Sequence, residues 1–208
     1  MPAEQKEYLE AIAFAGNTLL RLINDVLMLS RLETGQFELK PEAVDVEALL
    51  REVHAAFRLQ AGEKSLTLEL NCTGLPGPLC LDLQRFRQIM LNLVGNAVKF
   101  TVAGGVRIRA GYTAEAGAGG GTLAVEVADT GIGIPPEEAQ TIFEPFSQAE
   151  GTRGHRVYEG SGLGLAIAKR LLEAIKRLTS CSSLFNKPMR IRSEASLPRP
   201  SRNHPCSS

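Results

Sequence analysis

The sequence predicts an α/β protein, a two-layer α/β sandwich preceded by one long N-terminal helix. Three observations predict this class. Over the first forty residues, apolar positions recur every three or four residues, as they do on one side of a helix. From about residue 43 to 178, segments with helical spacing alternate with segments of alternating apolar and polar residues. Stretches rich in glycine and polar residues separate these segments, as loops do.

The long helix is predicted for residues 4–34, within an N-terminal segment of residues 1–40. Its narrow apolar seam has the spacing of a coiled coil or helix bundle. The seam consists of Leu9, Ile12, Gly16, Leu19, Ile23, Val26 and Ser30. Gly35 and Pro41 then end the helix. A seam of this length must be covered, either by another helix of a bundle or dimer or by the chain's own domain.

Residues 43–178 carry the predicted sandwich. Asp45 is a plausible cap for a helix over residues 46–61. Further helices are predicted for residues 83–100, 137–143 and 163–178, and strands for residues 65–70, 79–81, 106–110 and 123–128. The remaining residues, 179–208, are predicted to form a disordered basic tail in which only residues 189–194 resemble a strand.

Composition excludes several classes of protein. The formal net charge is zero. From Lys176 onward there are seven basic residues and one acid, but short charge-biased ends are usually solvated, so we expect no nucleic-acid partner. The four cysteines lack the spacing of a metal or redox site, which favours a reducing compartment. The N-terminus lacks a signal segment and the apolar stretches are shorter than a membrane span, so the sequence predicts a cytoplasmic protein without a membrane segment.

Asn92, Asn96 and Lys99 share one face of the helix predicted for residues 83–100, because they are spaced by four and three residues. Two carboxamide oxygens on one face can ligate a hard cation such as Mg²⁺, which also binds substrate phosphates. A lysine one turn further on supplies a positive charge for those phosphates. A solvated helix face would contain the same residues, so this motif alone leaves both interpretations open.

Asp129 ends a predicted strand and precedes Gly131 and Gly133, which allow a sharp turn and a close approach to a flat ligand. An ionised aspartate can accept a hydrogen bond from an exocyclic amine, which suits adenine. An ordinary turn that begins with aspartate has the same residues.

A second glycine-rich motif, with Gly160, Gly162 and Gly164, leads into the last predicted helix. Main-chain N–H groups at such a helix N-terminus bind phosphate. The loop of residues 147–159 before it contains three side chains that could place a cation near a γ-phosphate or simply be solvated. These are Arg153, His155 and Arg156.

These motifs together resemble the catalytic ATP-binding domain of sensor histidine kinases, in the superfamily that includes gyrase, Hsp90 and MutL. NLVGNAVKFT resembles the N box, DTGIGI the first glycine box, FEPF the F box and GSGLGL the second glycine box. The resemblance covers residues 43–178. It implies a Bergerat-type fold, with ATP and Mg²⁺ as cofactors.

The resemblance also implies roles for individual residues. Asn96 would ligate Mg²⁺ with the help of Asn92, Lys99 would contact phosphate, and Asp129 would bind the adenine amino group. The other implied cofactor-binding residues are Gly131, Gly133, Ile134, Gly160, Gly162, Leu163 and Gly164, and Arg156 is the candidate lid cation. Relatives that hydrolyse ATP have a general-base glutamate at the position of Asn92. Since an amide is a poor base, Asn92 favours phosphotransfer over hydrolysis.

Two departures from the family pattern limit this interpretation. Residues 4–34 resemble the second helix of the family's dimerisation hairpin, yet none of His54, His155 and His204 lies in a phosphoacceptor pattern. The sequence also diverges after about Ala174, so we expect part of the C-terminal strand pair to be missing. The chain therefore resembles a fragment, an alternative product or a mis-spliced gene model.

The first functional hypothesis is an ATP-binding catalytic domain of a two-component phosphorelay kinase. It would phosphorylate a histidine of a partner or parent protein, which then serves a response regulator, and it would form a homodimer through residues 4–34. The parent protein could be membrane-anchored. The alternative is a non-catalytic fragment that acts as a nucleotide-binding or dimerisation module. The sequence leaves open whether the chain itself is an enzyme.

Overall fold

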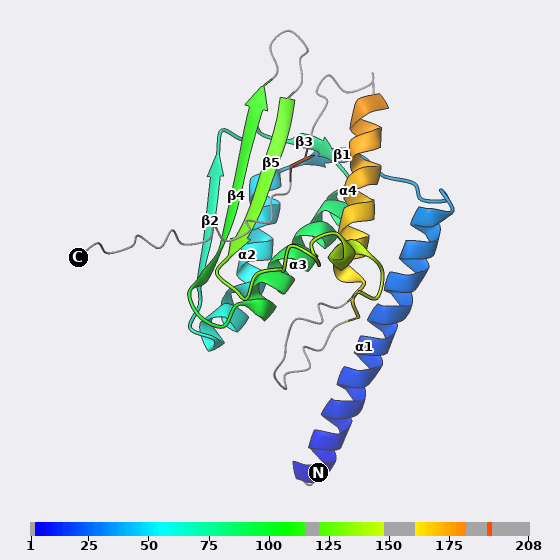
Figure 1. The fold of residues 1–208 in the computed structure, drawn as a ribbon, viewed down its shortest axis with the longest axis vertical. Coiled ribbons are helices and arrows are strands. Elements are labelled where there is room, and N and C mark those ends of the chain that lie inside the picture. The colour runs from blue at the N-terminus through cyan, green and yellow to red at the C-terminus, as the bar shows by residue number, and fades with distance from the viewer. Residues whose placement is uncertain (1–2, 115–120, 148–160, 182–190, 193–208) are drawn as a thin grey trace, which may run out of the picture.

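The computed structural model describes residues 3–114, 121–147, 161–181 and 191–192 (Figure 1). Three helices, α2, α3 and α4, lie against one face of a sheet, and the long helix α1 extends away from this domain (Figure 1). The predicted two-layer α/β sandwich with a long N-terminal helix is therefore confirmed. The predicted domain boundaries, 1–40, 43–178 and 179–208, stay predictions.

Among the described residues, helix α1 (Ala3–Glu33) packs against the domain with its C-terminal half. Leu29 is buried there, and Met28 and Leu32 pack against the core. Most of the preceding apolar side chains are exposed, and they include Leu9, Ile12, Leu19, Ile23 and Val26 of the predicted seam, whereas Leu22 is half-buried. The described part of the domain therefore leaves most of the seam uncovered, which contradicts the alternative in which the domain itself covers it.

The same helix bears on the expectation of no membrane segment. Residues 5–33 are long and apolar enough to cross a membrane by length and composition, since they include an 18-residue window with a mean hydropathy of 1.4. An exposed bundle seam gives the same signal, so the expectation stays a prediction.

A small two-stranded sheet joins α1 to the rest of the chain. Strand β1 (Glu42–Val44), which the sequence did not predict, pairs antiparallel with β3 (Leu79–Leu81). Asp82 follows β3 and is buried. One of its carboxylate oxygens accepts a hydrogen bond from the main-chain N–H of Lys40 at 2.9 Å, and the other accepts from the N–H of Arg85 at 3.0 Å. Asp82 therefore caps α3 and holds the linker from α1 at the same time.

Helices α2 and α3 each begin after an aspartate that caps them. Helix α2 (Val46–Glu63) is capped by Asp45, whose side chain accepts from the N–H of Ala48 at 3.0 Å. Helix α3 (Leu83–Phe100) has the predicted bounds, and α4 (Gly164–Cys181) extends beyond its predicted end. The helix predicted for residues 137–143 is wrong in most of its length, because only Thr141–Phe143 are helical, as the 3₁₀ turn η1.

The main sheet contains β2 (Thr67–Thr73), β4 (Gly105–Ala114), β5 (Gly121–Asp129) and β6 (Ile191–Arg192), in the order β2-β4-β5-β6. The central pair, β4 and β5, is antiparallel, whereas β2 pairs parallel with β4 and β6 parallel with β5. Strand β6 has two residues and pairs only with Leu123 and Ala124. Within the described chain, the outer edge of β5 beyond Ala124 therefore has no strand beside it.

The core lies between the sheet and the three helices. Alternate residues of β4 and β5 point into it, among them Ile108 and Leu123, which are fully buried. Phe86 of α3 and Ile167 of α4 meet them from the helical layer. Burying an aliphatic or aromatic side chain of this size stabilises a fold by about 1.5–3 kcal/mol. This packing fixes α3 and α4 against each other and so positions the motifs that they carry.

Candidate functional site

Helix α3 presents Asn92, Asn96 and Lys99 on one face, as its sequence spacing predicts, and all three side chains are half-buried. Val94 and Val98 on the other side of the helix are fully buried in the core. The polar face is thus held in one orientation by the packing of the apolar face.

Asn92 joins this face to the second glycine-rich motif. Its Nδ2 donates a hydrogen bond to the main-chain carbonyl of Gly164, the first residue of α4, at 3.1 Å. The two residues are 72 positions apart in the sequence. The fold therefore brings together two motifs that are separate in the chain.

The C-terminal end of α3, which carries Lys99, is secured by contacts that the sequence did not reveal. Lys64 Nζ donates to the carbonyls of Val98 and Lys99 at 2.8 and 2.9 Å, as basic side chains do at helix C-termini. Thr101 is buried, and its hydroxyl donates to the carbonyl of Ala97 at 2.7 Å. Lys99 itself lies with Nζ 4.8 Å from the centroid of the Phe100 ring.

The Asp129 turn needs glycine for steric reasons. Asp129 is exposed, and its Oδ1 accepts a hydrogen bond from the N–H of Gly131 at 2.8 Å. A Cβ atom at Gly131 would lie 2.7 Å from this oxygen and 2.7 Å from the carbonyl oxygen of Phe100, so a side chain does not fit. Gly133 has φ +70°, a conformation that favours glycine. The turn thereby fixes one carboxylate oxygen and with it the direction of the other.

Thr130 anchors this turn to the loop after α3. Its hydroxyl donates to the carbonyl of Ala103 at 2.8 Å and accepts from the N–H of Gly105 at 3.0 Å. Gly104, with φ +96°, leaves room for it, because a Cβ there would lie 2.2 Å from the Thr130 oxygen. Thr130 was not singled out from the sequence, where its only signal is its place between Asp129 and Gly131.

The second glycine-rich motif meets the FEPF segment. Gly162 has φ +67°, and a Cβ there would lie 2.8 Å from the carbonyl oxygen of Ser147. The side chain of Leu163 is fully buried, and its N–H donates to the hydroxyl of Ser161 at 3.2 Å. Leu163 thus fixes the start of α4 in the core. Ile134, which follows the Asp129 turn, is half-buried.

Several predicted residues lie outside the described part of the chain. These are Gly160, the three cations of the loop, Arg153, His155 and Arg156, and the tail residue His204. His54 lies in the described part, where its Nε2 and the carbonyl oxygen of Leu68 are 3.0 Å apart, a contact between α2 and β2. Among the described residues, no group of three or more His, Cys, Asp and Glu side chains could hold a metal ion.

Comparison with known proteins identifies a family. The model of "Histidine kinase-, DNA gyrase B-, and HSP90-like ATPase" matches residues 81–196. An uncharacterized sensor-like histidine kinase of Rhizobium meliloti (strain 1021) is 38% identical over 169 residues, which are 81% of this chain and 31% of the relative. The aerobic respiration control sensor protein ArcB of Escherichia coli (strain K12) is 37% identical over 172 residues, or 82% of this chain and 22% of ArcB.

Solved structures agree with this result. Full-length ShkA, crystallised in complex with AMPPNP, superposes with a TM-score of 0.70 at 41% identity, over 84% of this chain and 35% of ShkA. The Acinetobacter baumannii histidine kinase AdeS gives a TM-score of 0.64 at 25% identity, over 85% of this chain and 76% of the AdeS chain. The chain thus spans less than a third of the length of each of these two curated relatives.

Proposed function

Because the chain belongs to the histidine kinase-, DNA gyrase B- and HSP90-like ATPase family and carries the ATP-binding domain of its sensor histidine kinase members, we propose that it phosphorylates a histidine of another polypeptide. The phosphate would come from the γ position of Mg²⁺–ATP. This proposal rests above all on the hydrogen bond by which Asn92, on the polar face of α3, contacts the start of α4.

The nucleotide would lie between the polar face of α3, the Asp129 turn and the start of α4. Asp129 would accept a hydrogen bond from the adenine amino group, with Gly131, Gly133 and Ile134 shaping the turn against the base. Gly160, Gly162, Leu163 and Gly164 would form the phosphate side, where main-chain N–H groups and the positive end of the helix dipole favour anions. Lys99 would add a positive charge for the phosphates.

The residues on α3 fit a magnesium site. Asn92 uses its Nδ2 for the bond to Gly164, so its Oδ1 is the atom suited to ligate a cation, together with the carboxamide oxygen of Asn96. Mg²⁺ commonly takes one or two protein oxygens and completes its shell with substrate phosphates and waters. When bound, it would neutralise phosphate charge during transfer. Arg156 is the candidate for a further cation at the γ-phosphate.

The amide at position 92 favours phosphotransfer over hydrolysis. In the members that hydrolyse ATP, a glutamate at this position activates water, and an amide cannot take up that proton. In phosphotransfer, an imidazole nitrogen of the acceptor would form the bond to the γ-phosphorus. The bond from that phosphorus to the β,γ-bridging oxygen would break, and ADP would leave.

Helix α1 suggests the partners. Its exposed apolar seam supports dimerisation with a second copy or packing against the histidine-bearing hairpin of a parent or partner protein. A response regulator would then receive the phosphate, and the domain would work in the cytoplasm, whether or not the parent protein is anchored in a membrane. The same exposed seam favours the second candidate, a non-catalytic nucleotide-binding or dimerisation module.

Phosphotransfer to a supplied hairpin tests the proposal. The purified chain would be incubated with ATP labelled at the γ position, Mg²⁺ and a histidine-bearing hairpin from a sensor kinase, with the same hairpin lacking its histidine as control. We expect label on the first hairpin only. Nucleotide binding without transfer would favour the second candidate, and label on both hairpins would contradict transfer to histidine.

A further inference from the structure

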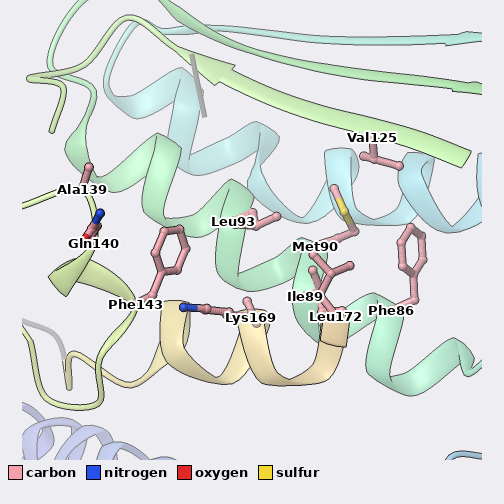
Figure 2. Close-up of a pocket in the computed structure, with 11 residues that line it drawn as sticks. Phe86, Ile89, Met90, Leu93, Val125, Ala139, Gln140, Phe143, Lys169 and Leu172 are labelled. Atoms are coloured by element: carbon pink, nitrogen blue, oxygen red, sulfur yellow. The ribbon is translucent and has the colours of Figure 1, made fainter. Parts of the chain in front are cut away.

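A cavity of about 500 Å³ lies between α3, α4, β5 and the segment of residues 139–143 (Figure 2). Its volume falls in the range of sites that bind small molecules, roughly 300–1,000 Å³. The side chains that line it include none of the residues proposed to bind nucleotide or metal. It is therefore a candidate site distinct from the proposed nucleotide site.

The lining is amphipathic along the length of the cavity. At one end it is entirely apolar, with Phe86, Val125 and Leu172 (Figure 2). At the other end the lining includes the amide of Gln140 and the ammonium group of Lys169, together with Phe143 (Figure 2). A ligand that matches both ends has an apolar body and one polar head.

The positive charge of Lys169 favours a negatively charged head group. Its Nζ lies 5.4 Å from the centroid of the Phe143 ring, a cation–π contact that keeps the ammonium group at this end of the cavity. Lys169 is exposed, so the end that it marks is accessible to solvent. A carboxylate placed there would meet a positive charge, while a cationic head would be repelled and a neutral head would gain little.

We propose that this cavity binds an amphipathic carboxylate of the fatty-acid class. The hydrocarbon chain lies among the apolar residues between α3, α4 and β5, and the carboxylate lies at the mouth beside Lys169 and Gln140. Because burial of apolar surface drives binding, the hydrocarbon chain supplies most of the affinity, and Lys169 selects the head group.

The test measures displacement of a fluorescent fatty acid, cis-parinaric acid, from the full chain by three ligands of equal chain length below their micelle concentrations. These are decanoate, decanol and decyltrimethylammonium. We expect decanoate to displace the probe at concentrations about threefold to fivefold lower than decanol, the effect of a partly exposed ion pair, and the cation to displace it least. Equal displacement by decanoate and decanol would overturn the proposal, as would no binding of the probe.

Two variants of neighbouring residues locate the head group. Lys169→Met should lower the affinity for decanoate by about threefold to fivefold and leave the affinity for decanol unchanged. Arg170→Met is the matched control, because Arg170 is the next residue of α4, is exposed and does not line the cavity. Equal losses in the two variants would contradict a specific role of Lys169.

A third variant and a competition experiment locate the apolar part. Leu172→Trp should fill the cavity and abolish binding of all three ligands, with circular dichroism showing that the fold is retained. Binding of decanoate that is unchanged in a folded Leu172→Trp protein would overturn the assignment to this cavity. Saturating AMPPNP should leave the probe bound, and its complete displacement would place the fatty acid in the nucleotide site instead.

Discussion

The side chain of Asn92 donates a hydrogen bond to the main-chain carbonyl of Gly164 at 3.1 Å and so ties α3 to the first residue of α4. Replacing Asn92 by Ala removes this bond and a proposed metal ligand together. We expect the free energy of unfolding to fall by about 0.5–1.5 kcal/mol, measured by urea denaturation, and nucleotide affinity to fall in the presence of Mg²⁺. Gln84→Ala is the control, since Gln84 is an exposed residue of the same helix. Equal effects of both changes would contradict the role of Asn92.

The carboxylate of Asp129 is held by the N–H of Gly131, which directs its second oxygen. Asp129→Asn replaces one acceptor oxygen by a donor group, which would face the donating amino group of adenine. We expect a loss of ATP affinity by tenfold or more, corresponding to about 1.4 kcal/mol, in calorimetric titrations. Weak GTP binding should change little. Unchanged ATP affinity in this variant would show that Asp129 does not bind the base.

A Cβ atom at Gly131 would collide with the carbonyl group of Phe100 and with Oδ1 of Asp129. Gly131→Ala should destabilise the protein by about 1–3 kcal/mol and weaken nucleotide binding, because the turn must open to admit the methyl group. Gly62→Ala provides the contrast, since nothing lies within 4 Å of a Cβ at this helical position. There we expect a gain of about 0.5–1 kcal/mol from helix propensity. Thermal and urea denaturation measure both, and equal effects would be inconsistent with the geometry of the turn.

Asp82 makes two hydrogen bonds from a buried position, to the main chain of Lys40 and of Arg85. Asp82→Ala should therefore cost about 2–3 kcal/mol, because it removes a helix cap and the attachment of the linker from α1. Asp45→Ala, which removes only the cap of α2, should cost about 1 kcal/mol. Urea denaturation compares the two, and a smaller loss for Asp82→Ala would contradict the double role.

The free energy of unfolding is expected to depend on pH through Asp25 of α1. Burial raises the pKa of its carboxyl group, an effect that the positive charge of Arg21 partly offsets. Because the pKa is raised in the folded state, the ionised carboxylate of Asp25 lowers the free energy of unfolding at pH values above that pKa. This loss of stability disappears as the pH falls below the unfolded-state pKa of about 3.9. Asp25→Asn should therefore raise the melting temperature at pH 7, with a gain that shrinks toward pH 4. Glu33→Gln, at an exposed acid of the same helix, is the control. A gain that is constant with pH would contradict this explanation.

Local signals explain which elements could be predicted. Helix α3 has its predicted bounds because Asp82 caps it and its apolar residues recur at helical spacing. Strand β1 was missed because its three residues are too short to show alternation. The helix predicted for residues 137–143 mostly forms turns, in which the N–H of Glu138 bonds to the carbonyl of Pro135 and the Thr141 hydroxyl bonds to the carbonyl of Glu138.

The site could be predicted only in part, for a related reason. Asn92, Asn96 and Lys99 share a face because their spacing is local, and the glycines of the Asp129 turn carry their own conformational signal. The bond from Asn92 to Gly164 and the contacts of Lys64 with the end of α3 join distant parts of the chain. Such contacts depend on how the helices pack, for which a single sequence contains no local pattern.

The central claim, a magnesium-dependent ATP site between α3 and α4, is tested most directly by one calorimetric titration of the purified chain with AMPPNP. The titration is run with Mg²⁺ and again with a chelator. We predict one nucleotide per chain, with an affinity that falls at least tenfold when the metal is removed. No binding at millimolar nucleotide would contradict the ATP site, and equal affinity with and without Mg²⁺ would contradict the metal site on α3.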